Sequence, residues 1–135
     1  MSNFDVADMA GLPAGCFTNQ VLYNAEARGI EFDLLPWSVE RGLPVMAYSP
    51  VGQGGALLRD PAMLAVAGRH GVSAAQAAIA WTLARPGVVT IPKAGDAGHV
   101  RENAAAGALR LTPEDLAEID AAFPPPTRKQ ALEML

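Results

Sequence analysis

Three short apolar runs along the chain predict β-strands. They cover residues 17–23 (FTNQVLY), 43–48 (LPVMAY) and 88–92 (VVTIP). The second and third runs are apolar at almost every position, which is typical of strands that are covered on both faces. Enough residues separate consecutive runs to form a crossover helix, and parallel strands need such a connection. The pattern therefore predicts an α/β fold with parallel strands.

Helix signals lie between and after these runs. The first helix is expected over residues 30–41, with Gly42 as its C-terminal stop. Pro36 must either lie in the first turns of this helix or mark its true start, because proline disrupts a helix interior. The second helix is expected to begin with Asp60 as N-cap and Pro61 at its first position.

Three further helices are expected from similar end signals. Ser73 and Gln76 have the spacing of a capping box ahead of the run AAIAWTLAR. Another helix is expected from residue 96 or 97 to about 106, and Thr112 should cap a last one, LAEIDAAF. The prolines at 124–126 end that helix.

Composition fits one folded domain over residues 1–135. Half of the residues are hydrophobic and 18% are charged, which suits a chain that buries a core. The formal net charge is -4 and the basic residues are scattered, unlike the basic stripe of a nucleic-acid binder. No apolar run approaches the roughly 20 residues of a membrane span, and the first residues do not resemble a signal peptide. We therefore expect a cytoplasmic protein that binds neither nucleic acid nor membrane.

Neither cysteine nor carboxylate positions indicate a metal site. The single cysteine, Cys16, excludes an internal disulfide, and it is expected to be a small buried hydrophobic residue. Solvation or helix capping is expected to explain the carboxylate pairs Glu31 with Asp33 and Glu114 with Asp115. HExxH and CxxC spacings are absent from the sequence.

Four segments resemble, in order and spacing, the motifs of aldo/keto reductases. They are TNQVLYN from Thr18, VMAYSPVGQG from Val45, IPKAGDAGHVREN from Ile91 and LRLTPEDLAEID from Leu109. The SNF that follows Met1 is similar to the serine-asparagine motif that ends the family's fifth strand. The resemblance implies the C-terminal half of that family, from the end of strand five through strand eight and the C-terminal helix. The implied fold is a partial, half (β/α)8 TIM barrel with parallel strands, because whole barrels need about 250 residues.

The resemblance also implies a nicotinamide-cofactor site. Ser2, Asn3 and Gln20 would hydrogen-bond the carboxamide, whose donors and acceptor suit hydroxyl and amide side chains. Tyr48, at a strand end, would stack on the nicotinamide ring. The alternatives are that Ser2 and Asn3 only cap a following helix and that Tyr48 is an ordinary core or rim aromatic.

Residues after Tyr48 would hold the pyrophosphate. Ser49 and Val51 match the family motif, and they lead into the glycines Gly52, Gly54 and Gly55. Glycines let a backbone approach a phosphate closely.

Three residues near the last strand match the family's adenosine site, and two others depart from it. Lys93 would pair with the 2′-phosphate of NADPH, and Glu102 and Asn103 would contact the adenine; the alternative for Lys93 is a solvated surface lysine. Many relatives have a hydroxyl residue at the position of Ala94 and an arginine at the position of His99. Alanine and histidine bind a phosphate less strongly than those residues do. We therefore expect NADPH to be preferred by a modest margin, with NADH as the alternative cofactor, and no metal.

None of the family's catalytic residues is matched. The tyrosine, lysine, aspartate and histidine that reduce carbonyls lie in the half that the motifs do not include. Tyr23, Tyr48, His70 and His99 are the tyrosines and histidines of the chain, and all match other positions. We expect the isolated chain not to reduce simple aldehydes above background, because a positioned general acid contributes about 10²- to 10⁴-fold.

The resulting functional expectation is an oxidoreductase that reduces aldehydes or ketones with NADPH in the intact parent, of which this chain is the cofactor-binding half. The alternatives are a noncatalytic nucleotide-binding module and a nonfunctional truncated product. Self-association is expected, because half a barrel has open strand edges. Its interior face, expected at Val45, Ala47, Val89 and Ile91, would lose cover.

Overall fold

The chain forms an α/β fold around one parallel sheet. This computed structural model describes residues 1–12 and 15–135. Within them three parallel strands lie in the order β1 (Asn19–Leu22), β2 (Val45–Tyr48) and β3 (Val88–Thr90). Each strand lies inside an apolar run identified in the sequence, so the prediction of an α/β fold with parallel strands is confirmed.

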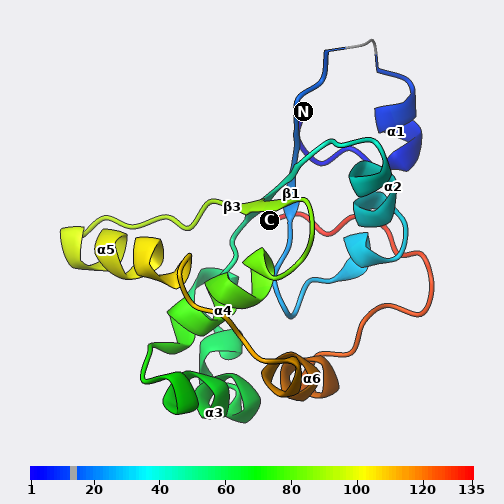
Figure 1. Cartoon of the computed structure of the whole chain (residues 1–135). Coiled ribbons are helices and arrows are strands. Elements are labelled where there is room, and N and C mark those ends of the chain that lie inside the picture. Colours follow the sequence, from blue (N-terminus) through cyan, green and yellow to red (C-terminus); the bar gives the residue numbers. More distant parts are fainter. Residues whose placement is uncertain (13–14) are drawn as a thin grey trace.

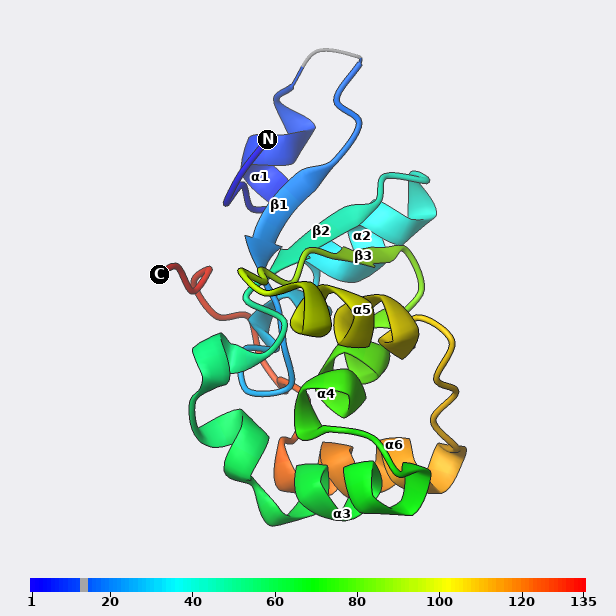
Figure 2. The same cartoon turned by 90° about the vertical axis from the view of Figure 1, so that its left-hand side faces the viewer.

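Helices cover one side of this sheet. In the described parts of the chain these are α1 (Val6–Ala10), α2 (Leu34–Glu40), α3 (Pro61–His70), α4 (Ala74–Leu83), α5 (Ala97–Ala106) and α6 (Pro113–Ala122), with short 3₁₀ turns η1 (Gly29–Glu31), η2 (Gly52–Gly54) and η3 (Ala56–Arg59). Helix α4 lies next to the sheet, and α3 and α6 lie farther from it (Figures 1 and 2).

The two faces of the sheet differ in cover, and the predicted orientation of β2 is wrong. Val45 and Ala47 are fully buried in the core that also contains Trp81 of α4. Met46 lies on the opposite face and pairs in register with Val89, which is 48% exposed. Val45 and Ala47 therefore point to the helices, and the uncovered face carries Met46 and Val89.

Local end signals predicted most helix boundaries correctly. Asp60 caps α3 by accepting a hydrogen bond from the backbone of Ala62, and the capping boxes that begin α4 and α6 are both present. The first expected helix is shorter than predicted, because η1 precedes it and α2 begins at Leu34. Pro36 consequently lies in the first turn of α2, where it displaces no helical hydrogen bond.

The helix α1 follows Ser2 and Asn3, but its start and end were not predicted. Its N-cap is Asp5, whose carboxylate accepts hydrogen bonds from the backbone N–H groups of Ala7 and Asp8. The alternative that Ser2 and Asn3 only cap this helix is therefore wrong.

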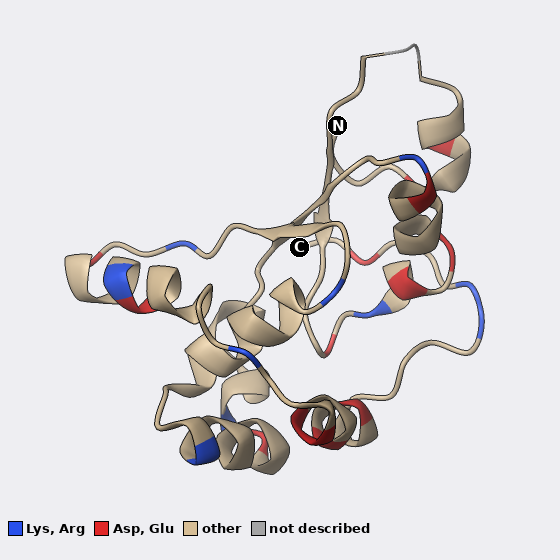
Figure 3. Cartoon of the chain, viewed as in Figure 1, with Lys and Arg blue, Asp and Glu red and all other residues tan. Residues whose placement is uncertain are grey.

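Buried ion pairs hold the loop after β1 against α6. Arg28 is 5% exposed; it pairs with Glu31 at 2.7 Å and with Asp120 of α6 at 2.9 Å. Tyr23 donates its hydroxyl to Glu31 at 2.5 Å, and burial together with this contact raises the Tyr23 pKa above its usual range. The expectation that solvation explains Glu31 is wrong. Acidic residues gather on α6, whereas basic residues are spread over several elements (Figure 3).

Cys16 is half-buried at the edge of the core, so it is less buried than predicted. No helix in the described part of the chain is both long and apolar enough to cross a membrane.

Candidate functional site

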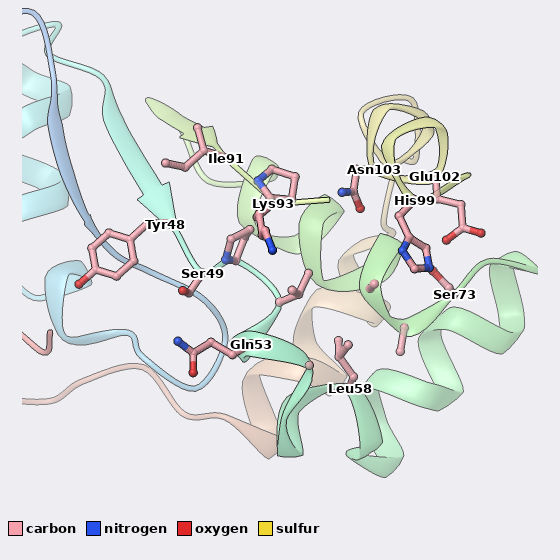
Figure 4. A pocket seen from close by; sticks show the side chains of 16 residues that line it. Tyr48, Ser49, Gln53, Leu58, Ser73, Ile91, Lys93, His99, Glu102 and Asn103 are labelled. Atoms are coloured by element: carbon pink, nitrogen blue, oxygen red, sulfur yellow. The ribbon is translucent and has the colours of Figure 1, made fainter. Parts of the chain in front are cut away.

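A cavity of about 950 Å³ opens where β2 and β3 end. Its wall comes from the loop after β2, the start of α4, the residues after β3 and the first turns of α5 (Figure 4). The lining residues are Tyr48, Ser49, Pro50, Val51, Gln53, Gly54, Leu58, Ser73, Ala74, Ala75, Ile91, Pro92, Lys93, His99, Glu102 and Asn103. Parallel strands direct their carboxyl ends to one edge, which is where α/β proteins place ligands.

Most of the residues expected in the cofactor site meet at this cavity. Those that line it are Tyr48, Ser49, Val51, Lys93, His99, Glu102 and Asn103. Ser2, Asn3, Gln20 and Gly52 do not line it. The structure therefore brings together residues up to 55 positions apart (48 to 103) in one wall.

Ser2, Asn3 and Gln20 form a neighbouring group. Ser2 and Gln20 form an isolated parallel β-bridge, and the Asn3 backbone N–H donates to the Gln20 carbonyl at 2.8 Å. Gln20 lies two positions before Leu22, which pairs with Tyr48, so Gln20 and Tyr48 share the less covered face of the sheet. The Asn3 Oδ1 atom is buried and has no hydrogen-bond partner in the described residues, which leaves its acceptor capacity unused.

A buried amide that sequence reasoning missed positions the loop after Tyr48. Asn24 is 3% exposed, and its Nδ2 donates to the Ser49 carbonyl at 2.9 Å. Its Oδ1 accepts from the backbone N–H groups of Glu26 and Ala27, both at 2.9 Å. Asn24 therefore ties the end of β1 to the cavity wall. The available signal was an amide directly after an apolar strand.

The backbone of this loop adopts left-handed conformations. Ser49 has φ 50° and Gln53 φ 55°, both unusual for residues with side chains. Gly52 has φ 57°, and a Cβ there would lie 3.1 Å from Glu26 Oε2 and 3.2 Å from Leu57 Cβ. Gly52 is therefore required by conformation and space, although it does not line the cavity. Gln53 does line it and was not predicted as a site residue.

The part of the cavity wall after β3 carries an exposed cation and one face of α5. His99, Glu102 and Asn103 recur at helical spacing, so they project to the same side. The Gln76 side chain donates to the Glu102 carbonyl at 3.1 Å and fixes α5 against the start of α4. Lys93 makes no ion pair with any carboxylate of residues 1–12 and 15–135. Its ammonium group is consequently available to an anionic ligand.

The combination suits an elongated ligand with an aromatic ring and an anionic group. The cavity wall contains a tyrosine at the end of β2, a polar loop with left-handed backbone conformations, and a lysine after β3 (Figure 4). No group of three or more His, Cys, Asp or Glu that could hold a metal ion occurs in the part of the chain that the structure describes.

Comparisons with known proteins identify relatives over nearly the whole chain. Residues 1–123 match the model of the aldo/keto reductase family. Methylglyoxal reductase YeaE of Escherichia coli is 46% identical over 144 residues, which cover 100% of this chain and 51% of that protein.

Solved structures give the same result. An aldo/keto reductase from Klebsiella pneumoniae, crystallised with NADP and acetate, superposes with a TM-score of 0.94 at 44% identity. An aldo-keto reductase from the same organism with NADPH gives 0.95 at 44% identity. Each alignment covers 99% of this chain and 50% of the other, so the chain spans about half the length of these barrel relatives and has the expected partial-barrel fold. The chain belongs to the aldo/keto reductase family.

Proposed function

We propose that residues 1–135 are the NADP-binding portion of a reductase that acts on aldehydes or ketones. The observation that carries this proposal is a cavity lined by both Tyr48 and Lys93, a lysine that makes no ion pair within the described residues. Relatives at 44% identity have been crystallised with NADP and NADPH, which supports the same ligand here.

The residues present fit such a cofactor. The volume of about 950 Å³ is at the upper end of the range of about 300 to 1,000 Å³ that is usual for ligand pockets. Tyr48 offers a flat surface for the nicotinamide ring, and Ser2, Asn3 and Gln20 offer hydrogen-bonding groups for its carboxamide. A bound nicotinamide supplies the hydride, and the protein supplies its orientation.

The remaining contacts follow the long axis of the cofactor. Ser49 and Val51, which line the cavity, and the adjacent Gly52 would provide backbone groups for the pyrophosphate. Lys93 and His99, which both line the cavity, would face the 2′-phosphate. Glu102 and Asn103, on the adjacent face of α5, would contact the adenine.

Replacement of Lys93 tests the proposal. Lys93→Ala should weaken NADPH binding by about 10- to 100-fold, since a charge-assisted hydrogen bond contributes about 1.5 to 3 kcal/mol, and should leave NADH binding nearly unchanged. Titration by calorimetry measures both affinities. Lys129→Ala is the matched control, because Lys129 pairs with Asp33 at 2.8 Å and does not line the cavity.

Two results would contradict parts of this proposal. Equal affinities of the unsubstituted chain for NADPH and NADH would contradict the role of Lys93. Failure to bind either cofactor would contradict the cofactor site as a whole.

A further inference from the structure

A carboxylate of the chain itself occupies the start of α5. Asp96 is the N-cap of this ten-residue helix, and its Oδ1 accepts from the backbone N–H groups of Gly98 at 2.7 Å and His99 at 3.2 Å. Free N–H groups at a helix start are the groups that usually bind a phosphate. In this protein Asp96 already uses two of them.

This carboxylate lies in the segment that joins Lys93 to α5. It is bonded to the backbone of His99, whose side chain lines the cavity, and it follows Lys93 by three residues. A Cβ on Gly98 would lie 2.8 Å from Asp96 Oδ1, so the glycine leaves room for the carboxylate to approach the backbone. The position of Asp96 is therefore built into the loop between Lys93 and α5.

The charge balance of the cavity wall and of Asp96 is unfavourable to an additional phosphate. Lys93 is the one Lys or Arg among the described residues that line the cavity. Glu102 also lines it, and Asp96 is hydrogen-bonded to the backbone of His99, another lining residue. A phosphate monoester carries about -1.5 to -2 charges at pH 7, and like charges repel it. A ribose hydroxyl instead can donate a hydrogen bond to a carboxylate, which is how acidic residues favour NAD in other dinucleotide sites.

We propose that Asp96 is a specificity-determining residue that reduces the preference of this site for NADPH over NADH. Its carboxylate opposes the 2′-phosphate that Lys93 attracts, and it withholds two backbone N–H groups from that phosphate. This inference rests on the proposed cofactor function of the cavity.

The test compares Asp96→Asn with the unsubstituted 135-residue chain. Asparagine is an equally good N-cap, so α5 keeps its start while the charge is removed. The ratio of the dissociation constant for NADH to that for NADPH should rise by about 3- to 10-fold. This is the size expected when the repulsion between two negative charges a few ångströms apart in a water-exposed site is removed. The gain should shrink in about 1 M salt, where the Debye length is about 3 Å.

Asp60→Asn is the matched control. Asp60 caps α3 in the same way, through Ala62 at 2.8 Å, but does not line the cavity, so the ratio should not change. Asp96→Ser, a second neutral cap, should reproduce the shift of Asp96→Asn.

The outcomes separate this inference from the proposed function. If both Asp96 variants leave the ratio unchanged, or weaken both cofactors equally, Asp96 acts only as a helix cap and the inference is wrong. The proposed function stands in that case if Lys93→Ala still weakens NADPH. Absence of binding of either cofactor to the unsubstituted chain would overturn both.

Discussion

Asp115 joins two helices through a buried carboxylate. Its carboxylate accepts hydrogen bonds from Arg69 at 2.7 Å and from the backbone N–H of Thr112 at 2.9 Å. It also contacts His70 Nε2 at 2.6 Å. Burial alone would raise the pKa of Asp115, but the contacts with His70, Thr112 and Arg69 outweigh it and hold this pKa well below its usual range. The end of α3 and the start of α6 are therefore linked by an ionised group.

Asp115→Asn should lower the free energy of unfolding by about 1.5 to 3 kcal/mol, the value of hydrogen bonds to a charged group. Urea denaturation at pH 7 measures this change. Glu118→Gln is the control, because Glu118 contacts the same Arg69 at 2.6 Å but is 39% exposed, and exposed pairs contribute at most about 1 kcal/mol.

The stability supplied by Asp115 also depends on pH. Its folded-state pKa lies below the unfolded value of about 3.9, so this stability is present above that pH and is lost as the pH falls through the folded-state pKa. The difference between the unsubstituted chain and Asp115→Asn should therefore narrow below about pH 4. A difference that widens with acidification would contradict the assignment.

At the scale of elements, α3 has one glycine inside the helix and one at its C-cap, with opposite roles. Gly71 ends the helix with φ 63°, a left-handed conformation that side chains disfavour. Gly68 lies inside the helix and is exposed. A Cβ at either position would meet nothing within 4 Å, so backbone conformation alone decides the effect of an added methyl group.

Gly71→Ala should destabilise the protein by about 1 kcal/mol or more, because alanine is strained at this φ. Gly68→Ala should stabilise it by about 0.5 to 1 kcal/mol, because alanine loses less conformational freedom in a helix. Chemical denaturation of both variants gives the comparison. Changes of the same sign would show that α3 is not an ordinary helix ended by a left-handed residue.

At the scale of the whole molecule, the sheet has an uncovered face and an open edge. Val89 and Ile91 are 48% and 37% exposed, and Phe17 is 84% exposed. Among the described residues β3 pairs only with β2, and the outer side of β1 carries a single bridge to Ser2. Open edges and apolar surface favour pairing with another chain.

The 135-residue chain should consequently self-associate. Light scattering should give a mass above the 14.1 kDa of one chain. Val89→Asp, on the uncovered face, should lower this mass, whereas Leu64→Asp should not, since Leu64 is equally exposed at 50% but lies on α3. A monodisperse mass near 14 kDa with a cooperative thermal transition would contradict the prediction.

The elements and part of the candidate site followed from local sequence. Helix ends at Asp60, Ser73 and Thr112 were predictable because capping involves residues within four positions of one another. Tyr48 and Lys93 were placed at strand ends by apolar runs and by family motifs, and both line the cavity.

Tertiary structure alone decided the features that depend on distant residues. A strand that is apolar on both sides does not specify which face the helices cover, and Val45 and Ala47 proved to be on the covered one. The Asn24 side chain donates a hydrogen bond to the Ser49 carbonyl, 25 positions away in the sequence. Arg28 forms the buried ion pair with Glu31 and also donates to Asp120, 92 positions away. Such contacts form only when separate elements pack together, because burial and ion pairing depend on what lies nearby in space and not on spacing along the chain.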